Sequence, residues 1–320
     1  MLQAILISIL CGFVSAVLSG LFGQGSMLAA LLFFVAPLPL MIAGLGWHPL
    51  IAALGALVGC LAMSFGLGSK AGLFFAAVVG LPSWLSCEVV LRLMVNRPAD
   101  ENARDYGLRL GVGIVGGIAL YAVPVTLVGA LAMNISYDSF NSVLRAFAEA
   151  AIRLLIESGH LQKEGIDVKS TAAIYATVMP TVIIFLVCIT LVLSLYIAVR
   201  VVRKSERLPF VPGPLFLVAL PKESLFVMVG SIGLATMTGW LGFIGACAVA
   251  ALTFCFILTG LAVMHSKTLG RSDRGMILGA AWGSMLVFGL PALVFALIGA
   301  ADAAFDLRRL SGGSSKTPNP

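Results

Sequence analysis

The chain has 320 residues, of which 60% are hydrophobic and 11% charged, and its mean hydropathy is +1.07. Because a soluble domain carries roughly 25% charged residues, this composition excludes a large soluble protein. The net charge of +6 is small and the basic residues lie between apolar segments, so we expect no nucleic-acid partner. The long apolar runs predict helices, since barrel strands alternate polar and apolar residues. The sequence therefore predicts an all-α, polytopic transmembrane helical bundle whose partner is the lipid bilayer.

Eight or nine apolar segments are long enough to span a bilayer. Their approximate ranges are 4–22, 26–46, 49–67, 71–94, 108–132, 172–202, 215–237, 241–264 and 276–301. The first segment lacks the basic region of a cleaved signal peptide, so we expect it to be retained as a span. The predicted organisation is an N-terminal membrane bundle over 1–132, an extramembrane insert over 133–170, C-terminal membrane spans over 171–309 and a disordered tail over 310–320.

The first predicted span carries a small residue at every fourth position. These residues are Ala4, Ser8, Gly12, Ala16 and Gly20. Small side chains at this spacing let two helix backbones approach closely. The stripe predicts helix docking, either against another helix of the same chain or onto a separate membrane subunit.

The stretch 31–59 contains no charged residue and predicts two spans folded back through a turn. Pro37 and Pro39 interrupt the first of these two spans. Prolines there would break the helix and free backbone carbonyls for a ligand or for neighbouring helices. Trp47 and His48 lie in the turn. A histidine at a turn is usually solvated, and a role in binding a ligand is the alternative.

Glu88 is the only acidic residue within the fourth predicted span, and Arg92 follows four residues later. A charge at the centre of a membrane helix costs about 2.5–3.5 kcal/mol, so a partner or a function is expected. The spacing suits an ion pair on one helical face. We interpret Glu88 either as half of a structural pair or as part of a polar or proton-coupling site.

The insert contains a predicted amphipathic helix from Tyr137 to Ser158. Its apolar positions recur at helical spacing and are Phe140, Val143, Leu144, Phe147, Ala151, Leu154 and Leu155. A ladder of alternating charge follows another face and consists of Arg145, Glu149, Arg153 and Glu157. Such a helix either lies on the membrane surface and covers the bundle or forms a lid over an outward-facing cavity.

The loops after even-numbered spans hold more Lys and Arg than the others, which predicts a cytoplasmic N-terminus in a multi-pass inner-membrane protein. Nine spans would place the C-terminus outside, which conflicts with Arg308 and Arg309 near the end. Either one span is miscounted or the short tail is exported. Arg309 also has the helical spacing to pair with Asp306.

No motif for metal, nucleotide or nucleophilic chemistry has a supporting context. The glycines Gly111, Gly113 and Gly116 match a dinucleotide-binding pattern, but they lie in an apolar span where helix packing explains them better. The six cysteines fall in apolar runs without a CxxC pair, which favours packing roles. We therefore expect a protein that is not an enzyme and has no cofactor and no metal site.

The block LLFFVAPLPLMIAGLGWHP, the run LTGLAVMH and the closing IGAADAAFDLRRL resemble the YybS-like bacterial membrane proteins, a domain of unknown function. The resemblance spans about residues 4–309. It implies a distant similarity to the S components of energy-coupling-factor transporters, whose first helix docks on a membrane coupling subunit through small residues. Ala4, Ser8, Gly12 and Ala16 match that pattern in form. S components have fewer spans than are predicted here, and the family supplies no catalytic residues.

The leading functional hypothesis is transporter-like binding of a small molecule within the bundle. Its candidate substrate-binding residues are Pro37, Pro39, Trp47, His48, Glu88 and Arg92. The alternative is a non-transporting scaffold or regulatory membrane protein. A transporter should show a polar cavity near Pro37, Glu88 and the insert helix, whereas a scaffold should show these positions packed without a cavity.

Overall fold

The computed structural model describes residues 2–21, 27–96, 98, 101–117, 121, 136–158 and 167–308, and within these ranges every regular element is a helix. Five helical segments are long and apolar enough to cross a membrane, namely Leu2–Gly20, Pro49–Leu67, Ser69–Val95, Val168–Lys204 and Gly239–Lys267. Three shorter apolar segments are Leu31–Gly46, Glu223–Ala235 and Pro291–Phe305. The all-helical class and its suitability for a membrane are thus as predicted, whereas the count of eight or nine spans stays a prediction.

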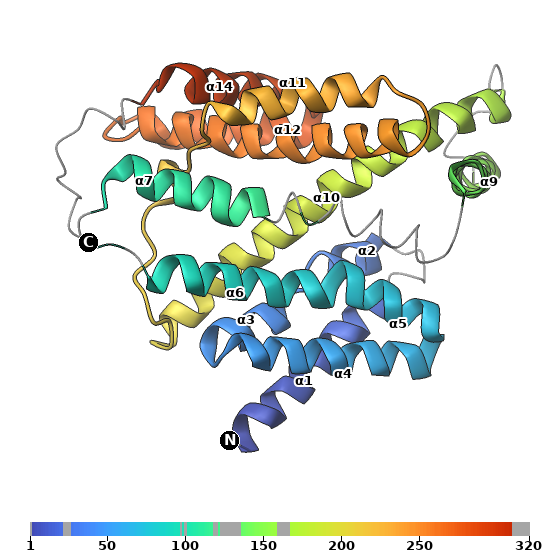
Figure 1. Cartoon of the computed structure of the whole chain (residues 1–320), viewed down its shortest axis with the longest axis horizontal. Coiled ribbons are helices and arrows are strands. Elements are labelled where there is room, and N and C mark those ends of the chain that lie inside the picture. Colours follow the sequence, from blue (N-terminus) through green and yellow to red (C-terminus); the bar gives the residue numbers. More distant parts are fainter. Residues whose placement is uncertain are drawn as a thin grey trace.

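The N-terminal helices form one layer of the molecule (Figure 1). They are α1 Leu2–Gly20, α2 Met27–Phe33, α3 Leu38–Gly46, α4 Pro49–Leu67 and a continuous rod of α5 Ser69–Phe75, the π-helix η2 Ala76–Gly80 and α6 Leu81–Val95. A turn over residues 34–37 separates α2 from α3. The predicted break at Pro37 and Pro39 is therefore present, because Pro37 cannot donate the backbone hydrogen bond that would continue the helix.

The small-residue stripe of α1 packs against α4 of the same chain. Ser8, Gly12 and Ala16 are buried, and Ala4 and Gly20 are half-buried at the edges of the contact.

Two contacts fix the register and direction of this pair. The Ser8 hydroxyl donates to the carbonyl of Ile51 at 3.0 Å, and a Cβ on Gly12 would collide with the carbonyl of Gly55. At the other end Gly20 lies beside Leu67. The two helices are therefore parallel, and a separate subunit could not reach Gly12 without displacing α4.

The described middle part of the chain consists of a short helix with a π-helical continuation, the insert helix and one long helix. The short α7 Ala103–Leu108 continues as the π-helix η3 Arg109–Gly116, and most of the predicted span 108–132 lies outside the described residues. Helix α9 Tyr137–Glu157 occupies the range where the sequence predicts the insert helix. Helix α10 Val168–Lys204 then runs for 37 residues, about 55 Å, obliquely through the molecule (Figure 1).

The C-terminal layer begins later than predicted. Residues 205–222, here called the linker, are irregular except for the 3-10 turn η4 Leu215–Leu217. Helix α11 starts only at Glu223 and ends at Ala235, so the predicted span 215–237 is wrong at its start. Prolines at 209, 212, 214 and 221 explain the delay, because each lacks the backbone donor that a helix needs.

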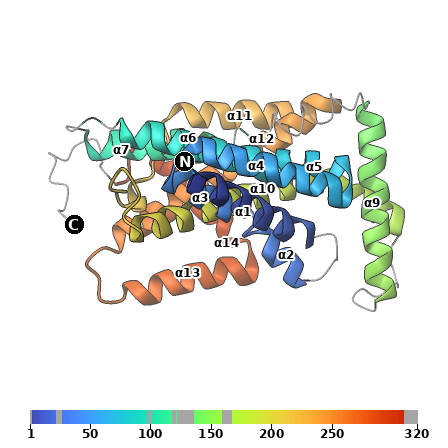
Figure 2. The ribbon, with the colours of Figure 1, turned by 90° about the horizontal axis from the view of Figure 1, so that it is seen from below.

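The predicted span 276–301 is also wrong, since it consists of two helices. After α12 Gly239–Lys267 the chain forms α13 Arg274–Phe288 and α14 Pro291–Phe305. Gly289 ends α13 with a φ of +68°, and Pro291 starts α14. The two helices pack on each other, and α13 lies at the margin of the bundle (Figure 2).

The α13–α14 hairpin brings the end of the described chain back to the end where α1 and α4 begin. Asp306 pairs with Arg104 at the start of α7, with 3.2 Å between Nη1 and Oδ2. The predicted partner of Asp306, Arg309, and the tail 310–320 lie outside the described residues. The α13–α14 hairpin adds a reversal that the nine predicted spans did not include, and the side of the membrane on which the chain ends stays a prediction.

Candidate functional site

A cavity of about 440 Å³ opens at the end of the bundle where α3 meets α4. Four of the six predicted substrate-binding residues line it, namely Trp47, His48, Glu88 and Arg92, together with Arg207 from the linker. The apolar part of its wall includes Leu45, Leu91, Val95 and Pro209. Residues from three distant parts of the sequence thus converge on one site, here called the Trp47 cavity.

The turn that carries Trp47 and His48 is fixed by a helix cap. His48 precedes α4 with extended backbone, and its Nδ1 accepts from the backbone N–H of Leu50 at 3.2 Å. Pro49 occupies the first turn of α4, where its missing N–H costs nothing. Because Nδ1 accepts, the proton of the neutral ring lies on Nε2, which remains a donor. The cap therefore orients a hydrogen-bond donor at the rim of the cavity.

Glu88 and Arg92 form the predicted ion pair on α6. The Arg92 Nη2 and Glu88 Oε1 atoms are 2.6 Å apart, and the side chains are 76% and 28% exposed respectively. An exposed pair of this kind contributes about 0–1 kcal/mol, so it does little for stability. Its effect on the cavity is electrostatic, because the carboxylate neutralises much of the charge of Arg92.

Arg207 supplies the second cation and was not predicted from the sequence. Its guanidinium carbon lies 4.3 Å from the centre of the Trp47 ring, a cation–π distance. No acidic side chain pairs with Arg207 in the part of the chain that the structure describes. The cavity therefore carries one cation in excess of its carboxylate, stacked on an aromatic face.

Pro37 and Pro39 do not line this cavity. Pro37 is fully buried, and Pro39 is half-buried within α3. At the break, the carbonyl of Phe34 accepts from the Ser194 hydroxyl of α10 at 3.3 Å. The carbonyl freed by the break is thus satisfied by a neighbouring helix, one of the two uses expected from the sequence.

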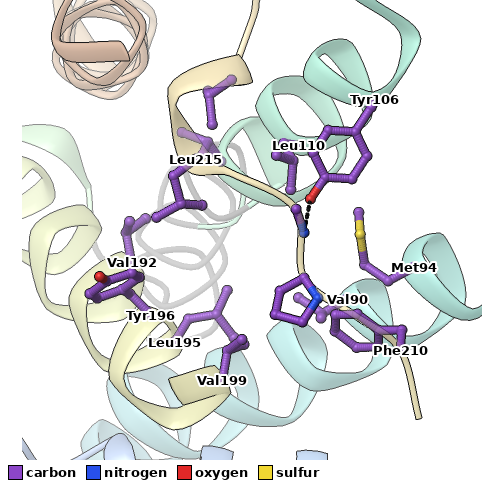
Figure 3. Close-up of a pocket in the computed structure, with 14 residues that line it drawn as sticks. Val90, Met94, Tyr106, Leu110, Val192, Leu195, Tyr196, Val199, Phe210 and Leu215 are labelled. Carbon is purple, nitrogen blue, oxygen red and sulfur yellow. Dashed lines mark hydrogen bonds between the residues drawn. The ribbon is translucent and has the colours of Figure 1, made fainter. Parts of the chain in front are cut away.

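A second cavity of about 110 Å³ lies between α6, α7, α10 and the linker (Figure 3). Its wall is almost wholly apolar, including Val90, Leu110 and Leu195. The Tyr106 hydroxyl at its edge already accepts from the backbone N–H of Gly213 at 2.8 Å. It therefore offers no charged group that could orient a polar substrate.

The linker that carries Arg207 is anchored by a buried arginine after α14. Arg308 donates from Nη1 to the carbonyl of Phe216 at 2.6 Å and from Nη2 to the carbonyl of Val218 at 2.8 Å. Its Nη2 also lies 2.6 Å from Asp302 Oδ2, and the two side chains are 0% and 4% exposed. The Arg308 guanidinium thus supplies hydrogen-bond donors to two carbonyls of the irregular linker, while its charge is paired with Asp302.

Within the described ranges no three or more His, Cys, Asp or Glu side chains gather to hold a metal ion. Comparison of the chain with models of protein families, with curated proteins and with solved structures gives no match.

Proposed function

We propose that the chain is a multi-pass membrane protein that binds a small organic anion in the Trp47 cavity, in a transporter-like role. The observation that carries this proposal is the convergence of Trp47, His48, Glu88, Arg92 and Arg207 on one cavity. Its volume lies in the range of about 300–1,000 Å³ that is typical of small-molecule sites.

The charges of the cavity favour an anion over a cation. Arg92 is held by Glu88 at 2.6 Å, whereas Arg207 is stacked on Trp47. A guanidinium in this setting can bind a carboxylate or phosphate through two parallel hydrogen bonds. The Nε2 donor of His48 is available to the same ligand, and the Trp47 ring would contact an apolar or aromatic part of it.

A transporter must also expose its site to the other side of the membrane. The break at 34–37 and the π-helix at 76–80 interrupt the two spans, α2–α3 and α5–α6, that carry most of the cavity. Interrupted helices of this kind are where transporters change conformation and bind substrate. We place the cavity on the cytoplasmic side from the distribution of Lys and Arg, together with a cytoplasmic N-terminus in an inner membrane.

The test is ligand-dependent thermal unfolding of the purified protein against a panel of organic anions, with matched cations of similar size. A ligand at 100 times its Kd should raise the free energy of unfolding by about 2.7 kcal/mol. Arg207→Gln and Trp47→Leu should abolish the response to the anion.

The matched control is Arg271→Gln. Arg271 is an exposed arginine paired with Asp273 in the loop between α12 and α13. This variant removes the same charge from a different place and should keep the full response. Stabilisation that survives Arg207→Gln, or that cations produce equally, would contradict the proposal.

The rival proposal of a non-transporting scaffold is favoured by the packing of the N-terminal layer. Pro37 is fully buried and the stripe of α1 is occupied by α4. A scaffold predicts no stabilisation by any member of the panel and no loss of membrane assembly in Arg207→Gln. The same titration therefore distinguishes the two proposals.

A further inference from the structure

Helix α9 has an apolar face that the rest of the described chain leaves uncovered. Val143, Phe147 and Leu154 on this face are 64%, 64% and 65% exposed, and Ala150 between them is exposed as well. These positions recur every three or four residues, so they form one stripe along the helix. The stripe is here called the outer apolar stripe.

The other two faces of α9 have different partners. Ala148 and Ile152 are buried against Ala172 of α10, while the charged ladder includes Arg145 and Arg153. At 100° per residue, the outer apolar stripe lies about 150° from the buried face and about 130° from the centre of Arg145 and Arg153, whereas these two arginines are centred about 80° from the buried face. A helix divided in this way meets three environments, which are protein, water and a third that favours apolar side chains.

The position of α9 identifies the third environment. Figure 1 shows α9 end-on while the long apolar helices run across the view, and Figure 2 shows it perpendicular to them. It lies at the end of the bundle where α10 and α12 begin. A helix that crosses the ends of membrane spans at a right angle lies parallel to the membrane surface.

Aromatic residues at the same level support this assignment. The rings of Tyr137 and Phe140 lie 5.5 and 5.2 Å from that of Trp240, in the first turn of α12. Trp and Tyr are enriched where membrane spans meet the headgroups, because their rings are apolar and their edges are polar. The start of α9 is therefore held at the level of a membrane–water interface.

We propose that α9 is an interfacial helix whose outer apolar stripe inserts into the membrane. Val143, Phe147 and Leu154 would contact the upper acyl chains, while Arg145 and Arg153 face water and headgroups. The bilayer is thus the partner of this surface. The inference is independent of any ligand in the Trp47 cavity.

A new tryptophan at Phe147 tests the proposal in the full-length protein, reconstituted into phosphatidylcholine vesicles. Ser142→Trp is the matched control, because Ser142 is exposed on the charged side of the same helix. The emission of the parent, which has four tryptophans, is subtracted from that of each variant. The added signal of Phe147→Trp should be blue-shifted and quenched several-fold more by lipids brominated near the headgroup than that of Ser142→Trp. Aqueous iodide should show the reverse order.

Three outcomes would overturn the proposal. Iodide could quench both variants equally, which would place the stripe in water. Brominated lipid could leave Phe147→Trp unaffected while iodide also fails to reach it, which would indicate a second protein on the stripe. If Phe147→Trp does not reconstitute, Val143→Trp replaces it in the same comparison. Equal quenching of Val143→Trp and Ser142→Trp, by brominated lipid and by iodide, would then overturn the proposal.

Discussion

Replacing Arg308 by methionine should destabilise the protein by at least about 3–5 kcal/mol, because removing one partner of a buried ion pair leaves a charge without compensation. The exposures of 0% and 4% place Arg308 and Asp302 in this class, and the shortest distance between them is 2.6 Å. Methionine is shorter than arginine, but it replaces the apolar stem of the side chain and keeps much of its packing. The loss therefore reports mainly on the charge and the hydrogen bonds.

The double variant Asp302→Leu with Arg308→Met separates the contribution of the ion pair from that of the hydrogen bonds to the linker carbonyls. Replacing both members of a buried pair by apolar residues is often neutral or stabilising. Here the guanidinium also donates to the carbonyls of Phe216 and Val218. Each carbonyl that loses its donor costs about 1–3 kcal/mol, so the double variant should remain about 2–6 kcal/mol less stable than the parent.

The assay is unfolding by increasing SDS in mixed micelles, followed by helical circular dichroism and by tryptophan fluorescence. The matched control is Arg271→Met, which removes an exposed arginine from the pair with Asp273 and should leave the unfolding curve unchanged. The reasoning is refuted if Arg308→Met and Arg271→Met unfold alike. A double variant as stable as the parent would refute the role assigned to the linker carbonyls.

Three further predictions concern packing, topology and pH. Gly12→Ala should lower stability by about 1–3 kcal/mol in the same assay, because its Cβ meets the Gly55 carbonyl, whereas Gly66→Ala adds a Cβ to open space on α4 and should not. Reporters fused to the two termini should report the same side of the membrane, and opposite sides would contradict the α13–α14 hairpin. Hydrogen bonds from the side chain of Ser170 and from two backbone N–H groups lower the pKa of Asp167, the cap of α10, below its ordinary value of 3.8. Its stabilisation is therefore present above that value and is lost as the pH falls through the lower, folded pKa. Asp167→Asn should flatten this acid-side loss in melting temperature relative to the parent, and parallel profiles would argue against it.

The sequence predicted the all-helical class and the apolar character of the helices, because length and composition decide whether a segment suits a bilayer. It failed where two short helices follow one another without a polar residue. The segment 276–301 is long enough for one span, and a Gly at 289 followed by Pro291 was the available signal for a helix end and a helix start. Because the segment 276–301 is apolar throughout, it was predicted as one span in spite of Gly289 and Pro291.

The candidate site was predicted where its contacts are local. Glu88 and Arg92 pair because four residues make one helical turn, and His48 caps the helix that it precedes. Arg207 was missed because 160 residues separate it from Trp47. The contact of Asp306 with Arg104 was also missed, because the two residues are 202 positions apart. Asp306 takes a left-handed conformation with a φ of 48° where α14 ends.

The linker connects the Trp47 cavity with Tyr106 and with Arg308. It carries Arg207 to the Trp47 cavity, binds Tyr106 through Gly213, and is fixed by Arg308. The backbone N–H of Ala219 also donates to the carbonyl of Gly107 at 3.0 Å, and a Cβ on Gly111 would collide with the Ala219 carbonyl. An irregular segment among apolar helices persists because its polar backbone groups are satisfied in this way. The position of Arg207 therefore depends on the end of α14. It follows that Arg308→Met should weaken the anion binding that we propose for the Trp47 cavity, without changing any residue that lines it.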